Sequence, residues 1–243
     1  MQIKKHIPNL ITLINLFCGC IAVVFAFDQN FEMAFLFVAL GIFFDFFDGF
    51  FARLYNVSSP LGLQLDSLAD MVTSGVAPGT IMFFMLTNAL DVDNQNYEIC
   101  NYNFWICLLG FIITLGSCYR LANFNIDTRQ TDSFIGLPTP ANALFILSLP
   151  LILKNTDSLL VLGMLTNVWF LLAITVFSAY ILNAEIPLFA LKIKNFSFQK
   201  YKLQIGFLLF SIVLIIFLRV TSIPLIIVSY VLLSVINNKI SKK

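Results

Sequence analysis

Charged residues are scarce in this sequence. The 243 residues include 14 Lys and Arg and 13 Asp and Glu, together 11% of the chain, whereas soluble domains average about 25%. Hydrophobic residues make up 59% of the chain, and the mean hydropathy is +0.91. These values exclude a soluble globular domain.

The sequence also lacks the features of several other protein classes. A net charge of +1 offers no basic surface for a nucleic acid, so we expect no nucleic-acid partner. The five cysteines include no C-x-x-C pair, and all but Cys100 lie within apolar segments, where a thiol behaves as a small hydrophobic group. The apolar segments are continuous and do not alternate with period two, which argues against a membrane β-barrel. No small-residue cleavage site follows the first apolar segment, so we expect that segment to be retained.

Long uncharged apolar segments dominate the chain. Most of them approach the roughly 20 residues that cross a ~30 Å hydrocarbon layer, which predicts an all-α, polytopic membrane helix bundle. We expect eight spans, at 9–27, 32–53, 63–88, 103–124, 139–153, 160–182, 203–218 and 222–237. The count falls to six or seven if a short or polar segment is re-entrant. Because no repeat or linker divides the chain, we expect one domain, 1–243, made of a six-helix unit (1–182) and a C-terminal helix pair (203–237).

The basic residues predict the orientation of the bundle. If the N-terminus is cytoplasmic, eight spans place twelve of the fourteen Lys and Arg residues inside and leave Lys154 and Arg219 outside. The loop 89–102 carries acidic residues without Lys or Arg, as an outward-facing loop can. We therefore expect an integral protein of the cell or inner membrane with both termini in the cytoplasm. The connector 183–202, with its lysines, is expected to contact the lipid headgroups.

Four aspartates interrupt the apolar pattern at the end of the second span and the start of the third. They are Asp45, Asp48, Asp66 and Asp70. A carboxylate at the centre of a membrane helix costs about 2.5–3.5 kcal/mol, so such residues usually pair, bind an ion or line a cavity. The i, i+3 and i, i+4 spacings place each pair on one helix face. Converging carboxylates repel one another unless cations neutralise them, and divalent ions such as Mg²⁺ prefer oxygen ligands. We interpret the cluster as a two-metal site.

Small residues accompany the acidic pairs. Gly49, Ala52 and Gly62 each stand four positions from one of these aspartates. They leave room for a ligand, although close packing against another helix is an equally good interpretation. Arg53 is a candidate for binding a phosphate, and the alternative is that it anchors the helix at the cytoplasmic surface.

These residues form one continuous motif. It reads Asp45-x2-Asp48-Gly49-x2-Ala52-Arg53-x8-Gly62-x3-Asp66-x3-Asp70. The motif matches, at every position, the signature of the CDP-alcohol phosphotransferase family, whose members are membrane enzymes that transfer a substituted phosphate from a CDP-linked donor to an alcohol and release CMP. The resemblance implies that all four aspartates bind the metal ions and that Asp70 is the general base. It also implies that Gly49, Ala52 and Arg53 line the CDP site and that Gly62 allows the ligand to approach the helix closely.

Four further stretches resemble the phosphatidylserine synthase branch of this family. They are Ile7–Asn15, Asp70–Pro78, Arg120–Asn125 and Phe134–Pro140. This resemblance implies transfer of the phosphatidyl group from CDP-diacylglycerol to L-serine, with two Mg²⁺ or Mn²⁺ ions. The chain departs from the pattern where Thr73-Ser74 replaces Ser-Phe and where Asn123 replaces Arg.

Other polar residues are candidates for the remaining contacts with the substrates. Asn9, Thr12 and Asn15 share one face of the first span, where they would contact the cytidine or, alternatively, make interhelical hydrogen bonds. Arg120 and Asn123 would bind the serine carboxylate or a donor phosphate, whereas the alternative for Arg120 is a cytoplasmic anchor.

Rival functions and partners remain open at this stage. Within the family the acceptor could be glycerol 3-phosphate or inositol phosphate, but a second phosphate calls for more basic residues than the motif region offers. A cation or proton transporter would also gather membrane carboxylates, yet it predicts acids along a transmembrane path and inverted repeats. We also consider a homodimer.

Overall fold

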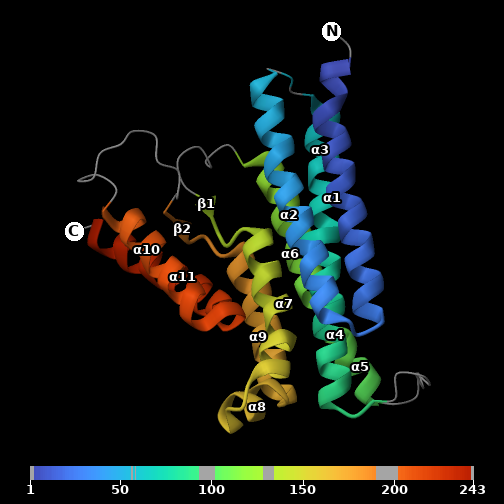
Figure 1. Ribbon diagram of the computed structural model, residues 1–243, viewed down its shortest axis with the longest axis vertical. Helices are drawn as coiled ribbons and strands as arrows, with labels where there is room; N and C mark the ends of the chain where they lie inside the picture. The colour runs from blue at the N-terminus through green and yellow to red at the C-terminus, as the bar shows by residue number, and fades with distance from the viewer. Residues whose placement is uncertain are drawn as a thin grey trace.

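The computed structural model describes residues 3–55, 57, 59–92, 102–127, 134–189 and 202–241, and these are helical almost throughout (Figure 1). The helices are α1 (Ile3–Phe27), α2 (Phe31–Leu54), α3 (Pro60–Asp70), the π-helical turn η1 (Met71–Val76), α4 (Ala77–Ala89), α5 (Tyr102–Leu108), the 3₁₀ turn η2 (Leu109–Phe111), α6 (Ile112–Ile126), α7 (Thr139–Asn155), α8 (Leu159–Leu165), α9 (Val168–Asn183), α10 (Lys202–Leu218), the 3₁₀ turn η3 (Arg219–Thr221) and α11 (Ser222–Ser241). Two short strands, β1 (Phe134–Ile135) and β2 (Pro187–Leu188), pair in antiparallel fashion.

The third helical stretch forms the centre of the bundle. It runs from α3 through η1 to α4, and three of the six residues of η1 and eleven of the thirteen residues of α4 are buried. Ile81 and Leu86 on α4 pack with Ile113, Ile146 and Leu171 from α6, α7 and α9. Long apolar side chains on the outer faces of the surrounding helices are exposed, as is expected for a protein surrounded by lipid.

The all-α membrane architecture predicted from the sequence is confirmed. Each of the eight expected spans falls on a helical stretch. Within the described residues, five helical stretches are long and apolar enough to cross a membrane. The number rises to six if the bent pair α8 and α9 is counted as one span. The last stretch, Lys202–Lys239, contains both α10 and α11. Arg219 adopts a φ of 48° between them, and the chain reverses there into a hairpin (Figure 1).

The span expected at 160–182 is interrupted. The chain breaks after α8, and α8 and α9 meet at an angle of 68°. Asn167 stabilises the new helix start after the break. Its side chain accepts a hydrogen bond from the Phe170 backbone N–H and so caps α9.

Several predicted features lie outside the described residues. These are Cys100, Arg129, most of the loop 89–102, most of the connector 183–202, and the side chains of Lys4 and Lys5. The orientation in the membrane and the division into a six-helix unit and a helix pair stay predictions.

Candidate active site

The four aspartates meet because the chain reverses between α2 and α3. The α2 helix ends at Leu54, and α3 begins at Pro60. Ser59 caps α3, because its hydroxyl accepts from the Gly62 backbone N–H. This cap fixes the start of α3, and the aspartate side chains of α2 and α3 converge beside α1. The α1 helix packs against both (Figure 1).

Three of the aspartates form a compact carboxylate triad. Asp45, Asp48 and Asp66 each contribute an oxygen atom, and these atoms lie within 4.8 Å of one another. Asp48 is buried with 7% exposure, and the other two are half-buried. An all-oxygen set of anionic ligands at this separation fits a hard divalent cation, which would also relieve the repulsion between the carboxylates.

Asp70 joins the triad through Asn15. The Asn15 side-chain amide donates to Asp70 Oδ1 over 3.2 Å and faces Asp45 Oδ1 at 3.4 Å. The Thr73 hydroxyl donates to Asn15 Oδ1 over 2.8 Å, which orients the amide so that its N–H groups face the carboxylates. Asn15 is fully buried, and it therefore holds two aspartates from different helices in a fixed relation.

Thr12 is the second residue of α1 that contacts an aspartate. Its hydroxyl lies 2.5 Å from Asp48 Oδ2 and donates to it. Thr12 and Asn15 thus make interhelical hydrogen bonds, which was one of the two roles predicted for them. Asn9, one turn earlier, lines the open cleft described below. Contact of the three residues with the cytidine stays a prediction.

Close helix packing positions Thr73. A Cβ atom at Gly19 would lie 2.5 Å from Thr73 Oγ1, and one at Gly41 would lie 2.7 Å from Thr73 Cγ2 and 2.8 Å from Asn15 Oδ1. Both positions therefore require glycine. Thr73 itself lies in η1, and π-helical turns are frequent at functional sites. Sequence reasoning noted Thr73 only as a departure from the family pattern and missed its contact with Asn15.

A cleft of about 890 Å³ opens beside the triad. Its lining residues are Pro8, Asn9, Thr12, Asp48, Gly49, Ala52, Arg53, Val57, Ser59, Gly62, Leu63 and Asp66. Every residue predicted to bind the CDP-linked donor except Asn15 is among them. Gly49 and Ala52 present little bulk to the cleft, and Arg53 is exposed at its edge. Ser59 was missed, although its place directly before Pro60 is a sequence signal for a helix cap.

Arg120 and Asn123 line a different pocket. This pocket has a volume of about 320 Å³, lies between α6 and α9, and shares no lining residue with the cleft. Arg120 is 6% exposed, and its guanidinium lies 5.5 Å from the centre of the Phe124 ring. Asp127, Asn183 and Glu185 complete the polar lining, and sequence reasoning missed all three.

The two sites are connected through α6. Asn125 donates to Ser67 Oγ over 2.8 Å, and the Ser117 hydroxyl lies 3.4 Å from the Ser74 carbonyl oxygen. Ser67 and Ser74 flank Asp70 by about one helical turn on either side. The helix that carries Arg120 is therefore bonded directly to the stretch that carries Asp70.

Comparison with known proteins agrees with the motif. A protein named CDP-diacylglycerol–serine O-phosphatidyltransferase from Bacillus subtilis is 37% identical over 136 residues, which is 56% of this chain and 70% of that protein. Proteins of the same name from Helicobacter pylori strain J99 and Saccharomyces cerevisiae are 36% identical over 144 residues and 33% identical over 165 residues. These matches cover 57% and 61% of this chain but only 54% and 55% of the two relatives. The chain thus spans little more than half the length of these two proteins.

The family assignment rests on a longer match. Residues 5–181 match the family described as CDP-alcohol phosphatidyltransferase, and this range contains all four aspartates, the residues of the 890 Å³ cleft, and both Arg120 and Asn123. The resemblance inferred from the motif is confirmed: the chain belongs to the CDP-alcohol phosphatidyltransferase family.

Proposed function

We propose that this protein transfers the phosphatidyl group of CDP-diacylglycerol to the hydroxyl group of L-serine, giving phosphatidylserine and CMP. The observation that carries the proposal is the carboxylate triad beside the 890 Å³ cleft that the signature residues line. The choice of serine is supported by the names of the relatives from Bacillus subtilis, Helicobacter pylori and yeast.

The triad would hold a divalent metal, Mg²⁺ or Mn²⁺. Its three carboxylates supply oxygen ligands only, which suits both ions. Binding of two ions, with Asp70 as a further ligand, is part of the proposal. When bound, the metal offsets the charge of the donor diphosphate and of the leaving CMP.

The cleft would bind the donor. Gly49 and Ala52 allow the nucleotide to approach the α2 backbone, and Arg53 would pair with a phosphate. Asn9 and Ser59 both lie beside Gly62 and offer hydrogen-bonding groups to the cytidine. A Cβ at Gly62 would lie 3.1 Å from Ser59 Oγ and 3.2 Å from Asn9 Oδ1. The acyl chains would remain in the surrounding lipid.

Asp70 would be the general base. As the serine oxygen forms its bond to the phosphorus that bears diacylglycerol, the bond from that phosphorus to the CMP oxygen breaks, and the serine hydroxyl proton passes to Asp70. Asn15 holds Asp70 through Oδ1, which leaves the other carboxylate oxygen for the proton. Positioning and charge compensation provide most of the catalysis in such transfers.

The pocket between α6 and α9 would bind the amino-acid part of serine. Serine carries one carboxylate and one ammonium group, and the pocket offers both complementary charges. Buried Arg120 would bind the carboxylate, and Glu185 would accept from the ammonium group. We further propose that the active site faces the cytoplasm, as the distribution of basic residues predicts, and that two copies form a homodimer, which light scattering of the detergent-solubilised protein would detect.

The proposal is tested by measuring CMP release from CDP-diacylglycerol with Mn²⁺ or Mg²⁺. Purified protein in detergent is given L-serine, glycerol 3-phosphate, inositol phosphate or no acceptor. We expect release that depends on serine and on metal, and an Asp70→Asn variant that folds but does not turn over. Release with another acceptor would refute serine as the substrate and leave the family's transfer reaction in place. An absence of release with every acceptor would refute the transferase function and favour an ion-flux assay.

A further inference from the structure

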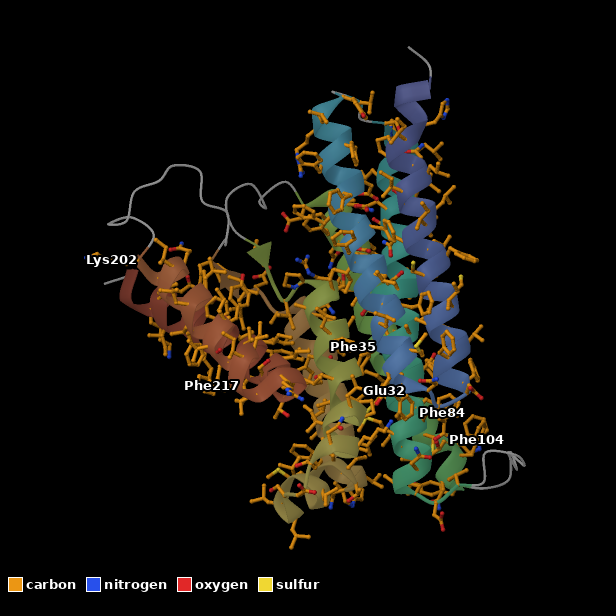
Figure 2. The ribbon with its side chains drawn as sticks, in the orientation of Figure 1. Glu32, Phe35, Phe84, Phe104, Lys202 and Phe217 are labelled. Atoms are coloured by element: carbon orange, nitrogen blue, oxygen red, sulfur yellow. The ribbon has the colours of Figure 1, made fainter. Side chains whose placement is uncertain are left out.

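The C-terminal hairpin packs against α7 and β2, and β2 begins two residues after the pocket residue Glu185, although the hairpin lies outside the matched family region 5–181. Figure 1 shows α10 and α11 leaning against the side of the bundle next to β2. Figure 2 labels Lys202 and Phe217, which mark the two ends of α10. The α10 helix is mostly exposed, whereas α11 packs on α7 and on β2.

The contact runs through a short segment that we call the strap, residues 184–189, which follows α9 and contains β2. Leu188 in the strap is buried together with Leu137 and Ile181, and Ile227 and Val231 of α11 pack against these three residues. The strap is thus covered by a small apolar cluster separate from the main core.

Two side chains of α11 hold the strap by its backbone. The Tyr230 hydroxyl donates to the Phe189 carbonyl oxygen over 2.8 Å, and the Asn238 amide donates to the Pro187 carbonyl oxygen over 2.5 Å. The rings of Phe189, Phe207 and Tyr230 also contact one another, with centroids 4.9–5.8 Å apart. The strap is therefore hydrogen-bonded to α11 and in aromatic contact with α10.

The strap in turn holds the other side of the pocket. Ile135 pairs with Pro187 across the β1–β2 ladder, and the Gly136 N–H donates to the Ile186 carbonyl oxygen over 2.9 Å. Gly136 has a φ of 79°, and a Cβ there would lie 2.4 Å from the Leu182 carbonyl oxygen, so this crossing admits only glycine. Ile135, Leu182 and Glu185 all line the pocket.

We infer that the C-terminal hairpin sets the geometry of the amino-acid pocket, with Tyr230 and Asn238 as positioning residues that hold the strap and, through it, Glu185 and Ile135. This inference rests on the proposed role of the pocket in binding the acceptor. It assigns to α10 and α11 a part in acceptor recognition, while the donor cleft is built wholly from residues 8–66.

The test compares Tyr230→Phe, Asn238→Ala and the double variant with wild-type protein. The matched control is Tyr180→Phe, which removes a hydroxyl from a tyrosine that is 64% exposed on α9. Because each variant removes one hydrogen bond, we expect the KM for serine to rise about three- to tenfold per substitution, with the KM for CDP-diacylglycerol unchanged. Hydrogen exchange at the Gly136 amide, which is bonded to the strap, should accelerate in the same variants and stay unchanged in the control.

The two readouts separate this inference from the proposed function. Faster exchange at Gly136 with a higher serine KM supports both. Faster exchange in a protein that turns over another acceptor, with that acceptor's KM raised, supports the role of the hairpin and refutes serine as substrate. Unchanged exchange and unchanged acceptor KM, or equal rises in the KM values for donor and acceptor, would overturn the inference.

Discussion

The contact between Asn15 and the two aspartates predicts a variant that stays folded but loses activity. Replacing Asn15 with Leu keeps the size of the side chain but removes the amide that donates to Asp70 over 3.2 Å and faces Asp45 at 3.4 Å. The Thr73 hydroxyl does not lose its last partner, because it also lies 3.2 Å from the Asn15 backbone carbonyl oxygen. No buried donor is left unsatisfied on that side, so we expect the loss of stability not to exceed that of the hydrogen bond to Asp70, about 1.5–3 kcal/mol, and the variant to remain folded.

The expected loss of activity follows from the bond to Asp70. A hydrogen bond to a charged group contributes about 1.5–3 kcal/mol, and the longer contact with Asp45 adds little. If this energy holds the base in its reactive position, kcat should fall by a factor of about 10 to 150. Serine-dependent CMP release in detergent measures this, with thermal unfolding of the same samples as the stability readout.

A matched control is available at the opposite end of the bundle. Asn88, near the C-terminal end of α4, donates to Gln29 Oε1 over 3.1 Å and contacts none of the four aspartates. Asn88→Leu should leave kcat within about twofold, since this pair is exposed and its hydrogen bond contributes little. If Asn15→Leu folds normally and also retains wild-type kcat, the assignment of Asn15 as the residue that orients Asp70 is wrong.

Three more predictions concern the metal, the helix packing and the acceptor. Asp66→Ala should raise the Mn²⁺ concentration for half-maximal activity by at least about tenfold, and an unchanged metal titration would argue against ligation. Gly41→Ala places a methyl group 2.7 Å from Thr73 Cγ2, so it should destabilise the protein by about 1–3 kcal/mol in thermal unfolding, whereas a wild-type melting curve would contradict the close packing. Arg120→Gln should raise the serine KM by about tenfold without changing the donor KM, and equal changes in both would point to a membrane anchor instead.

The sequence by itself determined the helical membrane architecture and the identity of the acidic residues. Apolar segments of membrane-crossing length can satisfy their backbone groups in lipid only as helices, so their positions follow from composition alone. The spacing of Asp45 and Asp48 places both on one face of their helix, because the helical period is local. The signature then grouped the four aspartates with Gly49, Ala52, Arg53 and Gly62. In the structure every signature residue except Asp45 and Asp70 lines one cleft.

Only the tertiary structure decided which faces meet. Nothing local links Asn15 to Asp70 or Thr73, which lie more than 50 positions further along the chain. Their contact depends on how α1 and α2 pack against η1 at Gly19 and Gly41. The separation of Arg120 from the 890 Å³ cleft has the same origin, since α6 turns one face toward α3 and another toward α9. A helical period specifies the face on which a side chain lies, but the neighbour of that face is specified by packing between segments distant in the sequence.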